Sequence, residues 1–240
     1  MSDSFKGRQL ALPVGLDVEA TFDNYYLPED SVNFQVLYGL YSLVHKPEDT
    51  AVLLWGEKRV GLTHLLRACV SQAEQLKQSS CYISLTETHK HSAEQFPALV
   101  EQKDLVCIDD IDAIAGDSEW ELALFAAYNQ LKDAGKRIVF ASHQSPKNLS
   151  FLLPDLRSRV LSGPVFQLQA LNDDDKIGAL QLQAHRLGMN MPLDVAQYIV
   201  NHTERNLGYL FKLLEHLDRE TLVQQRRLTI PFVKQVLKAQ

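Results

Sequence analysis

Residues 51–63 read AVLLW-GEKRVGLT, and this stretch decides the fold. A short apolar run ends at Trp55, a glycine-bounded loop spans Gly56–Gly61, and helical spacing follows over Leu65–Leu76. A loop of this kind between a strand and a helix matches the phosphate-binding loop, whose backbone N–H groups and helix dipole hold phosphate. Taken alone, the loop is also compatible with an ordinary turn between a strand and a helix.

One position departs from the phosphate-loop pattern, because Leu62 stands where the pattern requires lysine. That lysine reaches the β- and γ-phosphates, so its loss removes positive charge where a triphosphate is most negative. Thr63 still offers a hydroxyl to Mg²⁺, and the backbone N–H groups still hold a diphosphate. Lys58 and Arg59 are basic, but side chains in such loops usually point away from the phosphates. We therefore expect a site that prefers a diphosphate and hydrolyses nucleotide poorly.

A second apolar run ends in two carboxylates. Leu105–Ile108 is followed directly by Asp109 and Asp110. In nucleotide-binding α/β proteins, a strand end of this kind holds Mg²⁺ with one acid and orients water with the other. Taken alone, the pair is better explained as two solvated loop acids that cap the segment Ile111–Ala115. Downstream of a phosphate loop, the nucleotide-site interpretation is favoured.

Short apolar runs alternate with helical segments through the first two thirds of the chain. After Ala51–Trp55 the further runs are Cys81–Leu85, Leu105–Ile108, Ile138–Ala141 and Val165–Leu168. This alternation predicts an α/β domain with a parallel five-stranded sheet, covered on both faces. We expect three parts: a flexible N-terminal tail over 1–21, a nucleotide-binding base domain over 22–170, and an all-helical domain over 171–240. The expected helices of the last part are 173–187, 192–202, 207–223 and 231–237.

Composition excludes several classes of protein. The 240 residues carry a formal net charge of -6, which argues against a protein whose main task is to bind nucleic acid. No apolar run approaches the roughly 20 residues that span a bilayer, and the N-terminus lacks a secretory apolar segment. Three cysteines without C-x-x-C spacing argue against a disulfide framework or a zinc site. We expect a cytoplasmic protein with no membrane partner.

Several motifs together resemble the DnaA family of AAA+ initiator ATPases, and most closely its smaller Hda branch, which regulates DnaA. The motifs are Thr21–Asn24 (the segment against the nucleotide base), Gly56–His64 (Walker A), Ile108–Ile111 (Walker B), Ala141–His143 (sensor 1), Asp155–Arg159 (the arginine-finger box) and Leu228–Lys234 (the C-terminus). The resemblance extends from Gln9 onward. It implies an AAA+ P-loop NTPase base domain followed by a small all-α lid.

The resemblance also implies a set of site residues. The nucleotide-binding residues would be Phe22, Asn24, Tyr25, Gly56, Glu57, Lys58, Arg59, Val60, Gly61, Leu62, Thr63, His64, Asp109, Asp110, His143 and Gly208. Thr63 and Asp109 would hold Mg²⁺ if it is bound. Three positions that sense the γ-phosphate are altered together: Leu62, Gly208 at the sensor 2 arginine, and His143 where DnaA-like chains carry an acid. This pattern is typical of a protein that no longer hydrolyses the nucleotide in its own site.

Two further features point to partners. The resemblance implies that Arg159, with Arg157 as second choice, is an arginine finger supplied in trans. Such a finger raises the rate of phosphoryl transfer by roughly 10³–10⁵.

The tail sequence Gln9-Leu10-Ala11-Leu12-Pro13 resembles the short motif by which bacterial replication proteins bind the sliding clamp, the β subunit of DNA polymerase III. DNA would then be met only indirectly, through the clamp.

These features predict a negative regulator of replication initiation rather than an enzyme in its own right. Bound to a nucleoside diphosphate, most simply ADP, and docked on the DNA-loaded clamp, it would present Arg159 to ATP-bound DnaA and leave inactive ADP-bound DnaA. The alternative is a self-sufficient AAA+ ATPase that loads or remodels a replication factor, with Lys58 or Arg59 replacing the lysine. A third possibility is a scaffold with a vestigial site. The sequence leaves open a homodimer or head-to-tail AAA+ contacts.

Overall fold

Five apolar runs pair into one parallel sheet. The structure, a computed structural model, describes residues 20–45, 50–88 and 92–238. The strands are β1 (Ala51–Trp55), β2 (Ser80–Ser84), β3 (Leu105–Asp109), β4 (Arg137–Ser142) and β5 (Val165–Gln167). They lie in the order β2-β3-β4-β1-β5, and each neighbouring pair is parallel. Every residue of β3 and β4 is buried, because helices cover both faces of the sheet.

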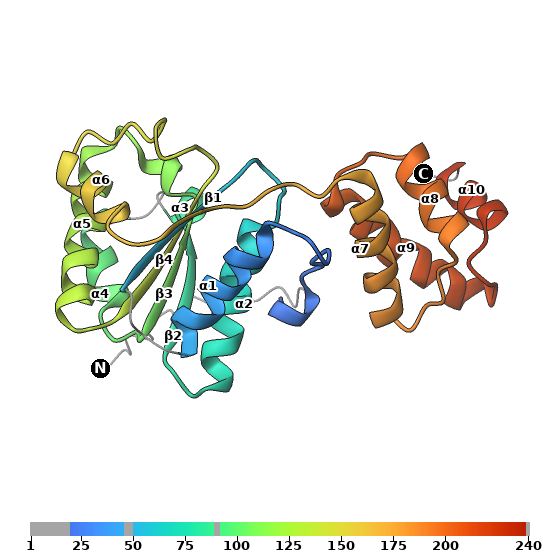
Figure 1. The fold of residues 1–240 in the computed structure, drawn as a ribbon, viewed down its shortest axis with the longest axis horizontal. Coiled ribbons are helices and arrows are strands. Elements are labelled where there is room, and N and C mark those ends of the chain that lie inside the picture. Colours follow the sequence, from blue (N-terminus) through green and yellow to red (C-terminus); the bar gives the residue numbers. More distant parts are fainter. Residues whose placement is uncertain (1–19, 46–49, 89–91, 239–240) are drawn as a thin grey trace, which may run out of the picture.

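Alternate strand residues supply two separate cores, one on each face. Leu54 packs with α1 (Asn33–His45) and α2 (Leu62–Gln75), whereas Leu53 packs on the opposite face. The opposite face is covered by α3 (Leu85–Thr88), α4 (Phe96–Val100), α5 (Ser118–Asp133) and α6 (Pro154–Val160). Three 3₁₀ turns, η1 (Phe22–Asn24), η2 (Ala93–Gln95) and η3 (Ile111–Ile114), complete the base domain. Figure 1 shows α1 and α2 on one side of the strands and α4, α5 and α6 on the other.

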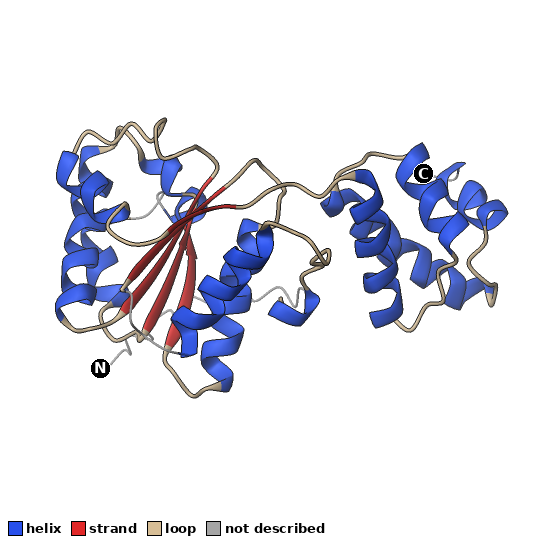
Figure 2. Cartoon of the chain, viewed as in Figure 1, coloured by secondary structure: helices blue, strands red, loops and turns tan. Residues whose placement is uncertain are grey.

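An all-helical lid follows the sheet domain. It consists of α7 (Asp173–Arg186), α8 (Leu193–His202), α9 (Leu207–Gln224) and α10 (Ile230–Lys238), which pack around their own core. Asn172 caps α7 in a reciprocal capping box with Asp175. Figure 2 shows the lid as helices only, joined to the sheet domain by one extended connection, residues 168–172. The domain change expected at residues 170–171 falls within this connection.

The predicted α/β fold with five parallel strands and a helical C-terminal part is confirmed. Most of the expected boundaries are shifted by a single residue, and the largest difference is at α2, which begins at Leu62, three residues before the expected start. Gly61, at φ 106°, turns the chain directly from the loop into the helix, a conformation that favours glycine. Within residues 20–45, 50–88 and 92–238, no helix has both the length and the apolar character needed to cross a bilayer.

Candidate nucleotide site

The loop after β1 has the backbone shape of a phosphate cradle. Arg59 (φ 71°) and Gly61 (φ 106°) adopt left-handed conformations. Conformations of this kind bend a loop into a concave shape that is lined by its backbone N–H groups. Gly61 precedes α2 and has no side chain with which to cap it. The first-turn N–H groups of α2 are therefore available to an anion, and the helix dipole favours negative charge there.

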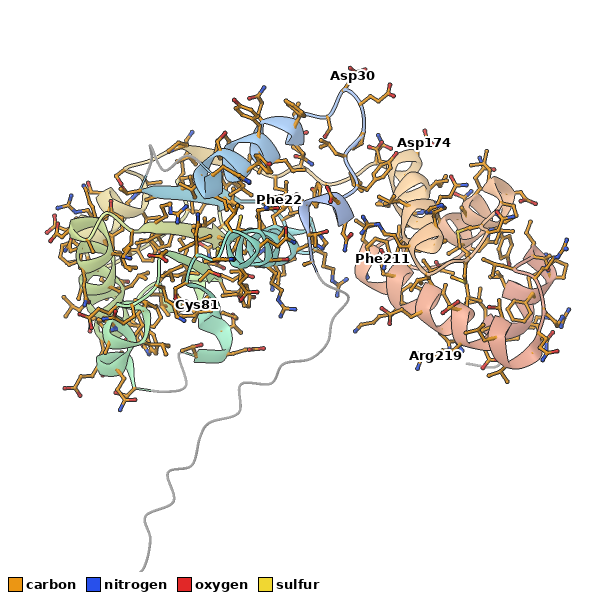
Figure 3. The ribbon with its side chains drawn as sticks, turned by 90° about the horizontal axis from the view of Figure 1, so that it is seen from below. Phe22, Asp30, Cys81, Asp174, Phe211 and Arg219 are labelled. Atoms are coloured by element: carbon orange, nitrogen blue, oxygen red, sulfur yellow. The ribbon has the colours of Figure 1, made fainter. Side chains whose placement is uncertain are left out.

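This loop forms one wall of a cavity of about 560 Å³, a size suited to a nucleotide. Eleven of the residues expected to bind nucleotide line the cavity: Asn24, Tyr25, Lys58, Arg59, Val60, Gly61, Leu62, Thr63, His64, His143 and Gly208. The opposite wall comes from the lid. Figure 3 shows Phe211 on the side of the lid that faces the base domain. The cavity therefore lies where the two domains meet.

The three altered positions, Leu62, His143 and Gly208, all line this cavity. Leu62 is only 2% exposed and packs into the core beneath α2. The His143 ring lies between two oxygens, with Nδ1 3.3 Å from the carbonyl of Gly56 and Nε2 3.5 Å from Oδ1 of Asp110. Gly208 contributes no side chain. None of the three therefore supplies the permanent positive charge that lysine or arginine would bring.

The acidic end of β3 lies behind the loop. The Thr63 hydroxyl donates to Oδ2 of Asp109 at 2.7 Å, and the Tyr82 hydroxyl donates to the same oxygen at 2.9 Å. Burial raises the pKa of the Asp109 carboxyl, because the hydrogen bonds offset its desolvation only in part, and Asp110 repels its charge. Asp110, at φ 59°, accepts from the Ser84 hydroxyl at 2.8 Å. Neither acid lines the cavity itself.

Thr63 and Asp109 fit the ligand chemistry of a nucleotide-bound magnesium ion. Mg²⁺ in such sites takes one or two protein oxygens and completes its octahedron with water and phosphate oxygens. A threonine hydroxyl at the loop, backed by a buried carboxylate at 2.7 Å, supplies oxygen donors of that kind. The described residues hold no group of three or more His, Cys, Asp or Glu side chains arranged as a metal site.

The segment Thr21–Tyr26 connects the phosphate-loop helix to the lid. Nε2–H of His64, on α2, donates to the carbonyl of Thr21 at 3.0 Å, and Arg186, on α7, donates to the carbonyl of Asp23. A Cβ at Gly178 of α7 would lie 2.2 Å from the Tyr26 hydroxyl, so glycine is required for this close contact. The segment thus joins both walls of the cavity.

The pH dependence of stability offers a test of this connection. Burial lowers the pKa of His64, and the nearby charges of Arg186 and Arg67 lower it further. A base with a lowered folded-state pKa contributes stability above its unfolded pKa of 6.5, and that stability is lost as the pH falls. We expect the free energy of unfolding to fall as the pH drops below about 6.5, because the unfolded chain then binds a proton at this residue that the folded protein does not.

His64→Gln keeps an N–H donor for Thr21 but does not titrate, so it should flatten this part of the pH profile. Urea unfolding of nucleotide-free protein at a series of pH values measures the slope. His202→Gln, a histidine stacked on Tyr198 at the lid surface, is the matched control and should retain the slope. Equal slopes in wild type and His64→Gln would contradict the prediction.

Several expected site residues lie elsewhere. Phe22 packs edge-on against Tyr41 of α1, with ring centroids 6.1 Å apart, rather than lining the cavity. Gly56 and Glu57 are also absent from the cavity wall. Arg159 lies on α6, which Figure 1 places at the end of the base domain away from the lid. The expected clamp motif, Gln9, Leu10, Leu12 and Pro13, lies outside the described residues.

The cavity also includes residues that were not expected to bind nucleotide, most of them on the lid helices. The further cavity residues are Tyr26, Leu171, Ala179, Gln183, Leu207, Phe211 and Glu215. Those on α7 and α9 recur every four residues, which places them on one face of each helix. The buried Asn33 was also missed, although it exchanges two hydrogen bonds of 2.9 Å with the backbone of Gln169 and so anchors the connection to the lid.

Comparison with known families identifies this architecture. The model of the bacterial DnaA ATPase domain matches residues 16–167, more than half of the chain. The protein belongs to the DnaA family. The model of the Hda lid domain matches residues 173–237, so a DnaA-type ATPase domain is followed by an Hda-type lid. The predicted relationship to DnaA and Hda is confirmed. The combination of a DnaA-type ATPase domain with an Hda-type lid supports a DnaA-related regulator of replication.

Solved structures share the fold of this DnaA-family protein. Domain III of the Thermotoga maritima replication initiation protein DnaA matches with a TM-score of 0.79 at 21% identity, covering 94% of this chain and 98% of that chain. AMPPCP-bound DnaA from Aquifex aeolicus matches with a TM-score of 0.72 at 19% identity, covering 84% and 66% respectively. The Thermotoga maritima RuvB branch migration motor gives 0.69 at 16% identity, covering 92% and 72%. The AAA+ fold class is therefore confirmed.

Proposed function

We propose that this protein stimulates hydrolysis of the ATP bound to DnaA by supplying Arg159 to the DnaA site in trans. It acts as a negative regulator of initiation and holds a nucleoside diphosphate, ADP, in its own site. It contributes a side chain to a reaction whose substrate and remaining machinery belong to the partner. Its own ATPase activity is weak or absent.

The observation that carries the proposal is the separation of Arg159 from the protein's own cavity. Arg159 lies on α6, is partly exposed, and is absent from the cavity wall, which borders the lid. Figure 1 shows α6 and the lid at opposite ends of the base domain. An arginine at that end is unable to reach nucleotide bound in the same chain but is available to another. An arginine finger neutralises charge in the phosphoryl-transfer transition state.

The composition of the cavity supports a resident diphosphate. The loop N–H groups bind phosphate through the backbone, whereas the lysine and arginine that would contact a γ-phosphate are replaced by Leu62 and Gly208. The Aquifex aeolicus relative is described as AMPPCP-bound, which supports nucleotide binding in this fold. When Mg²⁺ is present, Thr63 and Asp109 would hold it, and the ion would screen phosphate charge.

Nucleotide preference is a direct test of the altered loop. Leu62→Lys should shift the ratio of triphosphate to diphosphate affinity by about tenfold toward ATP, because a charged hydrogen bond to phosphate contributes about 1.5 kcal/mol. Calorimetric titration with ADP and with ATP measures the ratio. Leu62→Met, which changes the side chain without adding charge, is the control and should leave the ratio unchanged. A preference of the wild type for ATP would contradict the proposal.

The partners follow from the same reasoning. We propose docking on the DNA-loaded sliding clamp through Gln9-Leu10-Ala11-Leu12-Pro13, so that DNA is contacted only through the clamp. Weak docking on a ring threaded by DNA concentrates the protein where replication has occurred. ATP-bound DnaA is the second partner. Hydrolysis of its nucleotide, measured with wild type and with Arg159→Ala, tests the function.

One observation favours a second candidate function. Lys58 and Arg59 both belong to the cavity wall, although loop side chains of this kind were expected to point away from the phosphates. A self-sufficient AAA+ ATPase that loads or remodels a replication factor would use one of them in place of the missing lysine. This alternative requires Mg²⁺-dependent turnover by the purified protein alone, abolished by Asp110→Ala. The absence of such turnover would exclude it.

A further inference from the structure

A buried carboxylate holds the chain where it enters α6. Glu121, on α5, is fully buried and accepts three backbone hydrogen bonds. Its Oε1 accepts from the N–H groups of Gly116 at 2.8 Å and Leu152 at 3.0 Å, and its Oε2 accepts from Leu153 at 2.7 Å. Leu153 directly precedes Pro154, the first residue of α6. A buried charge with this many donors is strongly anchored, because burial without them costs several kcal/mol.

A second side chain of α5 holds the other end of α6. The Ser162 hydroxyl donates to the carbonyl of Arg159 at 2.7 Å. Having one hydrogen, it accepts from the buried Tyr128 hydroxyl, which lies 2.8 Å away. The guanidinium carbon of Arg159 lies 6.0 Å from the centre of the Tyr128 ring, within cation–π range. One tyrosine therefore contacts Arg159 through its ring and reaches its backbone through Ser162.

The two anchors match the length of the helix they hold. Glu121 and Tyr128 are seven residues apart on α5, about two turns or about 10 Å. Helix α6 is itself seven residues long. Between the anchors, Leu156 and Val160 are buried in the same core as Leu124 of α5. The arginine-bearing helix is thus fixed at its start, along one face and at its end by a single neighbouring helix.

We infer that Glu121 and Tyr128 are positioning residues for Arg159. They make no contact with the substrate of the reaction but fix the direction in which α6 presents the guanidinium. A misplacement of about 1 Å in a catalytic group costs about 10²-fold in rate, so a helix of two turns needs both ends held. This inference rests on the proposed function, because it assigns the two residues a role in the step that Arg159 performs.

Tyr128→Phe tests the inference most cleanly. It removes one hydroxyl and keeps the ring, so the hydrogen bond to Ser162 is lost without leaving a large cavity. We expect the maximal rate of DnaA ATP hydrolysis to fall about tenfold, while the protein concentration giving half-maximal stimulation stays unchanged. A change in folding or docking alone would move the half-maximal concentration instead. Tyr198→Phe, on the lid, is the control.

Combination with Arg159→Ala separates positioning from other effects. In the Arg159→Ala background, Tyr128→Phe should lower the maximal rate no further, because residues that act through one group are not additive. An additional tenfold loss in that background would overturn the inference. If Arg159→Ala alone leaves stimulation intact, the proposed function fails instead, and the two failures are distinguishable.

Glu121→Gln provides a second, independent variant. The amide keeps one acceptor oxygen but turns an N–H₂ toward one backbone donor, so the segment entering α6 is released. Hydrogen exchange should speed up at Leu152 and Leu153, and the maximal rate should fall about tenfold. Glu119→Gln, an exposed acid on the same helix, is the control. Faster exchange with an unchanged maximal rate would overturn the positioning role of Glu121.

Discussion

Arg159→Ala is expected to lower the maximal rate at which this protein stimulates hydrolysis of DnaA-bound ATP by about 10³-fold. The physical reason is that a guanidinium in a water-poor site neutralises charge that develops only in the transition state. Alanine removes that charge and leaves the buried face of α6, Leu156 and Val160, intact. The measurement is single-turnover hydrolysis of radiolabelled ATP preloaded on DnaA, with saturating protein and DNA-loaded clamp.

The neighbouring arginine supplies a matched control. Arg157 is exposed on the same helix, and its Nη2 donates to the carbonyl of Pro146 at 3.1 Å. Arg157→Ala removes the same charge from the same helix and is expected to change the rate by less than about tenfold. Equal losses in both variants would show that the net charge of the surface, rather than the finger, drives stimulation.

A double change of Leu10 and Leu12 to alanine is expected to lower stimulation by about 10²-fold at limiting protein concentration. In the proposed function, docking on the clamp raises the local concentration near DnaA, and that gain would disappear when the two leucines no longer fill apolar sites on the clamp. The reaction is followed at protein concentrations far below saturation, with clamp loaded on DNA.

Raising the concentration of the double variant should restore most of the lost rate, because Arg159 itself is unchanged. Leu16→Ala, in the same N-terminal segment but outside the motif, serves as the control and should stimulate like wild type. If the double variant stimulates normally at limiting concentration, the tail is not the tether. If no concentration restores the rate, the leucines do more than dock.

The architecture could be predicted from the sequence because its signals are local. Each strand is a short apolar run, and each run alternates with a helical segment. This alternation predicts strands buried on both faces, as Leu53 and Leu54 of β1 are. The glycine-bounded loop likewise predicted the position of the backbone N–H groups that would bind phosphate, since the loop and α2 are contiguous in the chain. The lid was recognisable as helices for the same reason.

The lid side of the cavity could not be predicted in this way. Phe211 and Glu215 have helical spacing, but the same spacing is required of any helix that packs on a neighbour. Which face meets the base domain depends on the orientation of the lid, which is set by the contact of Gly178 with Tyr26 and by Asn33. Those partners lie far away in sequence.

The anchors of α6 were hidden for a related reason. Glu121 falls on a helix that is rich in charge at its start, where an acid ordinarily faces solvent and complements the helix dipole. Its burial is decided by the N–H groups of Leu152 and Leu153, about thirty residues further along. A hydrogen-bond partner at that separation leaves no periodic signal in the sequence.

The measurement that tests the central claim most directly is ATP hydrolysis by DnaA with DNA-loaded clamp, with and without this protein, including a reaction without DnaA. We predict hydrolysis above the DnaA baseline only when all three components are present, and none from this protein alone. Turnover in the reaction without DnaA would contradict a regulator that acts in trans and would indicate a self-sufficient ATPase.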